Sequence, residues 1–292
     1  MKYTEPNHDV VTRTDMLYGQ APGYRTSMKA YDSQIAGSML RGMFNRRITL
    51  QDLTLDLYLP KDFEGPRPLI LFIHGGAFWY GDKSGTPFRD FCEYFASLGY
   101  VTASINYRLG FRLRRDDLRR AEQTGMQDAQ AALKYLLAHA DEYGIDKDNL
   151  FACGSSAGAV IALGLAFNGS PVKLRAIANL WGYMHDTSLL QNSGTSIISF
   201  HGDADQVVPL YEGYPMGKFP GFVKRRLMDK VYGSAVIDRE ARKRGLRSEL
   251  YVFPGEGHAL NQAPDHSLNP HQETIKKKMA EFFQEEIESK RS

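Results

Sequence analysis

The sequence is poor in the features that mark specialised classes of protein. Only 2 of its 292 residues are cysteine, so no dense disulfide framework can hold the fold. The longest apolar runs, PLILFIHGG and GAVIALGLAF, fall well short of the roughly 20 residues of a membrane-spanning helix. The formal net charge of +2 gives no reason to expect binding to polyanions such as nucleic acids. A chain with 42% hydrophobic and 24% charged residues is instead an ordinary globular protein.

The N-terminal stretch MKYTEPNHDVVTRTDM has neither an apolar core nor a small-residue cleavage site, so it is not a signal peptide. We therefore expect a cytoplasmic protein, or a secreted or periplasmic one if a leader has been removed. Cys92 lies in the helix-like pattern FRDFCEYFASLGY and Cys153 in the strand-like NLFACG, and we expect both to be free thiols. No internal repeat or low-complexity linker divides the chain.

From about residue 50 onward, strand-like and helix-like segments alternate. The strand-like segments are 53–60, 68–76, 101–107, 149–154, 175–182, 195–202 and 248–255. The helix-like segments are 87–100, 127–144, 157–167, 234–245 and 272–290. Such alternation predicts an α/β fold with a mostly parallel central sheet of about eight strands and helices on both faces.

Four short motifs follow predicted strands: HGG, GSSAG, HGDAD and PGEGH. In open parallel sheets covered by helices, ligands bind at the carboxyl ends of the strands. All four motifs therefore belong at the same edge of the sheet. This shared placement, more than any single motif, predicts an active site at that edge.

The motif GSSAG spans Gly154 to Gly158 and fits the pattern G-x-S-x-G, with Ser156 at its centre. The pattern describes a tight turn between strand and helix that lifts a serine hydroxyl clear of the backbone. Glycine is needed on either side because the turn leaves no room for side chains. The alternative is a glycine-rich turn in which Ser156 merely caps the helix. A phosphate-binding loop is a weaker interpretation, because no lysine follows the turn.

A serine nucleophile needs a general base, and the base needs an orienting acid. With this type of turn the chain order is serine, acid, histidine. His258, in VFPGEGHAL after a strand and a glycine turn, is the predicted base. His185 and His201 come too early in that order, and His266 and His271 lie in a polar, proline-containing loop.

The acid is expected in SFHGDADQVVP, which offers Asp203 and Asp205. We favour Asp205, which stands beside VVP where the chain turns into the next element. Asp203 is expected to brace the loop through backbone hydrogen bonds. A metal site of these two carboxylates with His201 is a weaker interpretation, because no further ligands stand nearby, and we predict no metal.

The segment HGGAFWYGDK follows the strand-like residues 69–73 and is the candidate oxyanion loop. Backbone N–H groups of Gly76 and Ala77, together with that of Ala157, are expected to stabilise an anionic tetrahedral intermediate. We expect His74 to be structural and to hold the loop in place.

The ordered motifs HGGAFWYG, GSSAG, HGDADQVVP and PGEGH resemble the α/β-hydrolases of the esterase/lipase group that carry an HGG-type oxyanion loop. The resemblance is closest to the small carboxylesterase-like branch that includes feruloyl and acetyl-xylan esterases, and it covers roughly residues 50–290. It implies a triad of Ser156, Asp205 and His258. It also implies that the arginine of NYRL (106–109) forms a structural brace with Asp128.

The resemblance implies a division into an N-terminal extension (1–50) packed on an α/β-hydrolase catalytic domain (51–292). Residues 1–50 have weak periodicity, so they wrap the domain or pack in a dimer. Two departures from the family stand out. The third glycine of the usual HGGG is Ala77, and an insertion occupies about 210–233.

The insertion is either a surface excursion or a cover that shapes the substrate pocket through Tyr211, Tyr214 and Met216. Aromatic residues after strand ends are further candidates for substrate contacts, although such residues are equally ordinary core material. The candidate substrate-binding residues are Trp79, Trp181, Tyr183 and Tyr211. The arginine-rich run 107–120 is expected to be a solvated face rather than an anion site.

The sequence therefore predicts a serine hydrolase that cleaves carboxylic esters through an acyl-enzyme, without a cofactor. The substrate would be a small-molecule or carbohydrate ester, and neither nucleic acid nor membrane is an expected partner. An amidase or peptidase with the same triad is the nearest alternative, and a non-catalytic binding protein with this fold is more remote. Acyl and alcohol specificity and the oligomeric state stay open.

Overall fold

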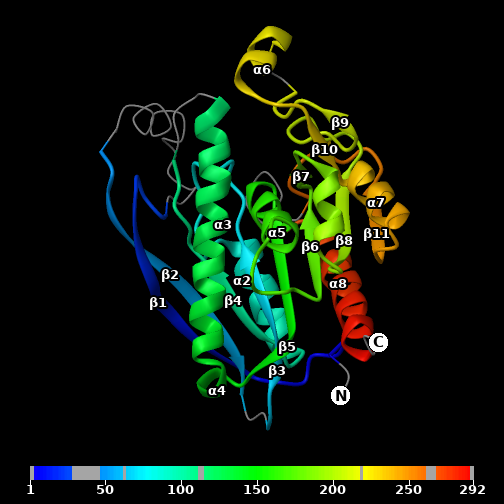
Figure 1. Ribbon diagram of the computed structural model, residues 1–292. Helices are drawn as coiled ribbons and strands as arrows, with labels where there is room; N and C mark the ends of the chain where they lie inside the picture. The colour runs from blue at the N-terminus through cyan, green and yellow to red at the C-terminus, as the bar shows by residue number, and fades with distance from the viewer. Residues whose placement is uncertain are drawn as a thin grey trace.

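The computed structural model describes residues 3–27, 47–61, 64–110, 115–217, 220–260 and 268–289 (Figure 1). Its strands are β1 (Val10–Gly23), β2 (Thr49–Pro60), β3 (Arg67–Ile73), β4 (Val101–Ile105), β5 (Ile145–Ser155), β6 (Ala176–Leu180), β7 (Tyr183–Met184), β8 (Ser196–Gly202), β9 (Glu212–Gly213), β10 (Val231–Gly233) and β11 (Ser248–Phe253). Its helices are α2 (Thr86–Ser97), α3 (Arg115–Ala138), α4 (Ala140–Tyr143), α5 (Ala157–Phe167), the 3₁₀ helix η1 (Thr187–Asn192), α6 (Gly221–Leu227), α7 (Ser234–Lys243) and α8 (His271–Glu288).

Within the described residues, eight strands form one sheet in the order β1-β2-β4-β3-β5-β6-β8-β11. The pairs β1–β2 and β2–β4 are antiparallel, and all the pairs from β4 to β11 are parallel. The predicted fold class is confirmed. The chain winds outward from β3 in both directions, to β4 on one side and β5 on the other. The carboxyl ends of β3 and β5 therefore flank the crevice where folds of this class bind their ligands.

Two hydrophobic cores lie on opposite faces of the sheet because successive side chains of a strand alternate in direction. In β3, Leu69, Leu71 and Ile73 belong to one core, which includes buried residues of α3, α5 and α7. Ile70 and Phe72 belong to the other, which includes buried residues of α2 and α8. Figure 1 shows α3 and α5 side by side on the near face of the sheet. The helices on both faces fix the position of the sheet edge that carries the motifs.

The predicted strands and helices are present, with shifted ends. The helix expected over 127–144 is longer and begins at Arg115, and a separate short helix, α4, follows it. Strand β5 begins at Ile145, before the predicted 149. The helix predicted over 157–167 has the observed bounds of α5.

Strand β1 is the main element that the sequence did not predict. It pairs along its length with β2 and forms the edge of the sheet, so the segment before residue 50 contributes a strand. Its register shifts twice, between Arg13 and Met16 and between Leu17 and Gly19. Such bulges break the alternation of side chains that identifies a strand in a sequence.

The segment 210–233 is folded rather than an open excursion. Its strand β10 pairs with both β7 and β9 in a separate three-stranded sheet. The backbone of the same segment also bonds to the loop after β8, where the N–H of Met216 donates to the carbonyl of Val207 at 2.7 Å. Helix α6 projects beyond the rest of the segment at the top of the molecule (Figure 1).

Candidate active site

Ser156 lies at the turn between β5 and α5, where the backbone is strained. Its φ of 52° and ψ of −117° are unfavourable for a residue with a side chain. The turn is possible because Gly154 and Gly158 lack side chains. A Cβ on Gly154 would lie 2.1 Å from the carbonyl oxygen of Gly158, and one on Gly158 would lie 2.0 Å from that of Ile73. The glycines of GSSAG thus let the turn pack directly on the end of β3.

The structure brings together the three residues predicted as a triad, although they stand on different strand ends. The Oγ of Ser156 lies 2.9 Å from Nε2 of His258. On the other side of the ring, Nδ1 of His258 lies 2.7 Å from Oδ2 of Asp205. Because Nδ1 faces a carboxylate, it carries the proton, and Nε2 is free to accept a hydrogen bond from the serine hydroxyl.

The Asp205 carboxylate is buried, with none of its side chain exposed, and its two oxygens have separate partners. Oδ1 accepts hydrogen bonds from the backbone N–H groups of Val207 at 2.7 Å and Val208 at 3.0 Å. Burial by itself would raise the pKa of Asp205, but hydrogen bonds from His201 and His258 outweigh it and hold that pKa well below the usual range. Asp205 therefore stays ionised beside His258.

His201 is a member of the site that the sequence analysis set aside. Its side chain is fully buried, and its Nε2 lies 3.2 Å from Oδ2 of Asp205 and 3.1 Å from the carbonyl of Val208. Two acceptors at Nε2 place the proton there, so Nδ1 accepts from the Ser234 hydroxyl at 2.8 Å. Ser234 in turn is bonded to Asn179. The only sequence signal was the position of His201 directly in HGDAD, since its partners come from distant segments.

The loop after β3 lies against the Ser156 turn. A Cβ on Gly75 would lie 2.9 Å from the carbonyl oxygen of Ser155 and 3.3 Å from Cβ of Ser156. Gly76, Ala77 and Phe78 all have positive φ, at 106°, 52° and 61°. The predicted oxyanion loop is therefore a tightly coiled, strained segment beside the serine.

His74 lies inside this loop and is fully buried in the way that a structural residue would be. Its ring stacks on Tyr107 with centroids 4.5 Å apart, and its Nδ1 lies 2.7 Å from the carbonyl of Gly75. Burial lowers the pKa of His74 to about 4, so the ring is neutral at physiological pH. The Tyr107 hydroxyl also donates to the His74 carbonyl at 3.0 Å.

Two further structural predictions from the sequence are confirmed. Asp203 is a brace, although it joins two loops: its Oδ1, in the loop after β8, accepts a hydrogen bond at 2.6 Å from the N–H of Gly255, in the loop after β11. Arg108 and Asp128 form a two-point ion pair, with Arg108 Nη2 2.7 Å and Nε 2.9 Å from Oδ1 of Asp128. Arg119 in the arginine-rich run pairs with Asp229 of the insertion at 2.9 Å.

The candidate substrate-binding residues lie in two different environments. Trp79, Trp181 and Tyr183 are buried, and Trp181, 1% exposed, meets the His258 ring edge to face with centroids 6.3 Å apart. Tyr183 lines a cavity of about 110 Å³ between α3, α5 and β7, and its hydroxyl donates to Glu122 at 2.7 Å. Tyr211 lies in the open, with 65% of its surface exposed. Trp181 thus supports the catalytic histidine candidate from within the core.

The described residues show no metal-binding cluster, no disulfide and no membrane-spanning helix. No group of three or more histidine, cysteine, aspartate or glutamate side chains there is arranged to hold a metal ion. Cys92 and Cys153 are buried free thiols, as expected. None of the described helices has the length and apolarity that crossing a membrane requires.

Comparison with known proteins points to esterases. The profile of the BD-FAE family matches residues 55–178, a range that contains Ser156 and the loop after β3 but neither Asp205 nor His258. A probable isoprenylcysteine alpha-carbonyl methylesterase of Arabidopsis thaliana is 33% identical over 108 residues, which are 37% of this chain and 21% of that protein. Gut esterase 1 of Caenorhabditis briggsae is 31% identical over 157 residues, which are 53% of this chain and 25% of that protein. The chain thus spans about a quarter or less of these two relatives.

Among solved structures, esterase 2 of Thermogutta terrifontis phosphorylated by paraoxon is similar over 80% of this chain and 89% of its own, with a TM-score of 0.61 and 23% identity. Its native form covers 81% of this chain and 88% of its own at 25% identity, with a TM-score of 0.57. The shared fold and the sequence match around Ser156 agree with each other. The chain has the α/β-hydrolase fold, and the relatives and solved structures that it matches are esterases.

Proposed function

We propose that the protein hydrolyses carboxylic esters with Ser156 as nucleophile, His258 as general base and Asp205 as the orienting acid. The observation that carries this proposal is the continuous chain of contacts from Ser156 Oγ to His258 Nε2 (2.9 Å) and from His258 Nδ1 to Asp205 Oδ2 (2.7 Å). A serine hydroxyl is a weak nucleophile without an adjacent base. Here the base lies at hydrogen-bond distance and is held in the required tautomer.

In the acylation step, Ser156 Oγ attacks the ester carbonyl carbon while His258 Nε2 takes the hydroxyl proton. The imidazolium that forms is stabilised by the ionised Asp205, whose pKa is held low by His201 and His258 despite burial. The tetrahedral intermediate then collapses, the bond to the alcohol oxygen breaks, and His258 gives its proton to the departing alcohol. The acyl group is left on Ser156.

The negative charge of the tetrahedral intermediate needs preorganised donors. The N–H groups of Gly76, Ala77 and Ala157 are assigned this role, because the loop after β3 packs on the Ser156 turn and Ala157 begins α5. Removing one such donor typically costs about 3 kcal/mol of transition-state stabilisation. Ala77 in place of a third glycine still supplies an N–H group.

Water completes the cycle. His258 takes a proton from a water molecule that attacks the acyl-enzyme carbonyl, and Ser156 leaves with that proton when the acid product departs. The residues of this chain therefore provide nucleophile, base and charge stabilisation for both halves of the reaction. Esters are the favoured substrates because the relatives that match this chain are named as esterases.

The proposal is tested by following hydrolysis of p-nitrophenyl esters from acetate to octanoate, beside methyl ferulate and acetylated xylan. Ser156→Ala should lower turnover on the order of 10⁶-fold, because the nucleophile is lost. Ser155→Ala is the matched control, since Ser155 stands in the same motif and is assigned no chemical role. Ester hydrolysis that persists in Ser156→Ala would refute the assignment, and wild-type turnover of amides alone would shift the reaction to an amidase.

A further inference from the structure

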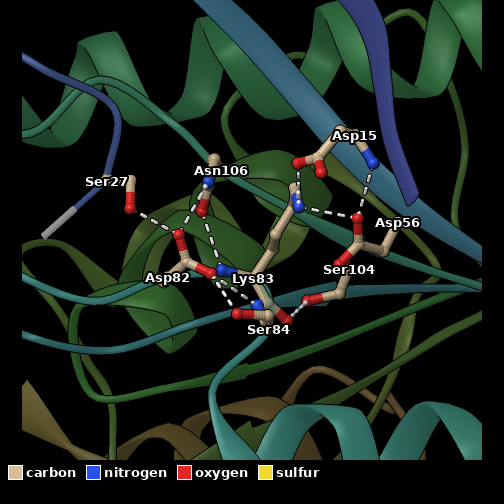
Figure 2. A network of polar contacts seen from close by, with 8 residues as sticks. All are labelled: Asp15, Ser27, Asp56, Asp82, Lys83, Ser84, Ser104 and Asn106. Atoms are coloured by element: carbon tan, nitrogen blue, oxygen red, sulfur yellow. Dashed lines mark hydrogen bonds and ion pairs between the residues drawn. The ribbon is translucent and has the colours of Figure 1, made fainter. Parts of the chain in front are cut away.

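The last two residues of the oxyanion loop, Asp82 and Lys83, form the centre of a polar network (Figure 2). Figure 2 shows partners that converge on them from the N-terminal segment, from β2 and from the end of β4. The network lies outside the triad, and the proposed mechanism gives it no part. Its position at the end of the loop raises the question of what it does for Gly76 and Ala77.

The side chain of Lys83 is buried between two carboxylates. Its Nζ lies 2.6 Å from Oδ1 of Asp56 and 2.8 Å from Oδ1 of Asp15, and only 5% of the lysine side chain is exposed. Asp56 is also buried and accepts a hydrogen bond from the backbone N–H of Asp15 at 2.9 Å. Burial by itself would lower the pKa of Lys83, but the bonds to Asp15 and Asp56 outweigh burial and raise that pKa above its usual value. The ammonium therefore stays charged.

The backbone of Lys83 is fixed on both sides as well. Its N–H donates to Oδ1 of Asn106 at 2.7 Å, and its carbonyl accepts from the Ser104 hydroxyl at 2.8 Å. Ser104 belongs to β4 and Asn106 follows it directly. With side chain and backbone both bound, Lys83 has one position relative to the sheet.

Asp82 adds a second set of bonds to the same point. Its carboxylate accepts from the N–H of Ser84 at 2.8 Å and from the amide of Asn106 at 3.1 Å, and it also accepts from the hydroxyl of Ser27. Burial raises the pKa of Asp82, but these hydrogen bonds outweigh it and hold that pKa well below its usual range. The N-terminal segment therefore reaches the network twice, at Asp15 and at Ser27.

Close contacts link the anchored residues Asp82 and Lys83 to the rest of the oxyanion loop. The N–H of Tyr80 donates to the carbonyl of Gly76 at 3.1 Å, which closes the loop on itself. A Cβ on Gly81 would lie 2.2 Å from Nδ1 of His74. Gly81, near the end of the loop, is therefore in close contact with His74 at its start. A shift at Lys83 would accordingly be transmitted to Gly76 and Ala77 within a few bonds.

We propose that Lys83 is a positioning residue for the oxyanion loop, and that Asp56 together with Asp15 of the N-terminal strand holds Lys83 in place. The N-terminal segment thereby contributes to the rate of ester hydrolysis, although it supplies no reacting group. This inference rests on the proposed function. It predicts that loss of the anchor weakens binding of the oxyanion more than binding of the neutral substrate.

The first experiment compares Lys83→Met with Lys276→Met. Lys276 is an equally buried lysine on α8, with its own ion pair to Asp90 of α2 at 3.1 Å. We measure kcat and KM for p-nitrophenyl acetate, the thermal midpoint, and inhibition by a trifluoromethyl ketone and by the corresponding alcohol. The ketone forms an oxyanion on Ser156, whereas the alcohol cannot.

For Lys83→Met we expect kcat to fall at least about tenfold with KM changed less than about twofold, and affinity for the ketone to fall by a similar factor as kcat. Affinity for the alcohol should be unchanged. Lys276→Met should lower the thermal midpoint while leaving kcat and ketone affinity within about twofold of wild type. Equal losses of kcat in both variants, or an unchanged kcat in Lys83→Met, would overturn the proposal.

A milder pair of variants covers the case in which Lys83→Met does not fold. Asp15→Asn removes one carboxylate from Lys83 while keeping a residue that tolerates the positive φ of 54° at this position. Its control is Arg13→Gln, which breaks the ion pair of the same strand with Glu142. Asp15→Asn should lower kcat about two- to fivefold and Arg13→Gln should not, and identical behaviour would contradict the proposal. Absence of Ser156-dependent turnover in the wild type would instead contradict the proposed function itself.

Discussion

The two ends of the oxyanion loop are held by opposite kinds of interaction. At the end that enters from β3, the loop meets the Ser156 turn through glycines, with Gly75 against Ser155 and Gly158 against Ile73. At the end that leaves toward α2, it is anchored by the half-buried carboxylate of Asp82 and the buried ammonium of Lys83. Close backbone packing tolerates almost no added atom, whereas an ion pair tolerates changes of shape but not loss of charge.

This contrast explains why one end was visible in the sequence and the other was not. Glycines at a close contact leave a local motif, such as GSSAG or HGG. The charged anchor draws its partners from positions as far apart as Asp15, Asp56 and Asn106, and each of these alone resembles any surface residue. Local packing is thus readable from neighbouring residues, while long-range polar contacts require the fold.

After the loss of the nucleophile itself, the largest effect is expected at the acid loop. Asp205→Asn should lower kcat on the order of 10⁴-fold with the fold intact, because an amide no longer fixes the tautomer of His258 or stabilises its cation. Asp203→Asn is the matched control two residues away, since Asp203 braces Gly255 and does not contact the histidine ring. Steady-state kinetics on p-nitrophenyl acetate measure both. Equal effects of the two variants would show that Asp205 acts only as a brace.

The close packing of the Ser156 turn on the end of β3 is tested by Gly158→Ala. The new methyl group would lie 2.0 Å from the carbonyl oxygen of Ile73, so the turn must shift. We expect a loss of about 1–3 kcal/mol in the free energy of unfolding, together with reduced kcat. Gly194→Ala is the control, because a Cβ there meets nothing within 4 Å. Denaturant unfolding compares the two variants, and an unaltered stability of Gly158→Ala would remove the packing explanation.

The charged features of the site and anchor should make the protein less stable in acid. The folded-state pKa values of Asp205 and Asp82 lie below the ordinary value of 3.8, so the unfolded chain binds more protons as the pH falls. Their contribution is complete above about pH 5 and is lost progressively below about pH 4. The urea midpoint, measured between pH 3 and 7, should decrease as the pH is lowered through this window. The decrease should be less steep in Asp205→Asn. A steeper decline in that variant would contradict the direction of the shift.

The smallest effect is expected at the insertion. Tyr211 is well exposed, so Tyr211→Ser should leave kcat for p-nitrophenyl acetate and the thermal midpoint unchanged. If the side chain contacts substrate, KM for esters with large acyl or alcohol groups rises a few-fold while KM for acetate does not. Equal KM values across the ester series would leave the insertion without a substrate contact at this residue.

Much of the fold was predictable because most of the strands and helices carry their own hydrophobic pattern. The buried run of β3 and the apolar α5 needed no tertiary information. The start of α3 at Arg115 was missed because its first turns are rich in charged residues and lack a continuous apolar stripe. Strand β1 was missed because its two bulges break the alternation of its side chains.

At the site, the sequence predicted that the three triad residues lie next to one another. It did not predict that His201 and Trp181 contact them from the interior. Ser156, Asp205 and His258 each follow a strand, so the parallel sheet itself gathers them at one edge. His201, near the end of β8, and Trp181, directly after β6, point into the interior and contact the triad residues from there. The direction of a side chain after a strand depends on the turn that follows, which the sequence pattern does not specify.

The central claim, that Ser156 is the activated nucleophile, is tested most directly by reaction with paraoxon followed by peptide mass spectrometry. Attack by Ser156 Oγ on phosphorus releases p-nitrophenolate and leaves a diethylphosphoryl group on the serine. The account predicts one equivalent of p-nitrophenolate and a single adduct on Ser156, with no adduct in Ser156→Ala and far slower labelling in Asp205→Asn. An unmodified protein, or an adduct on another residue with Ser156 free, would contradict it.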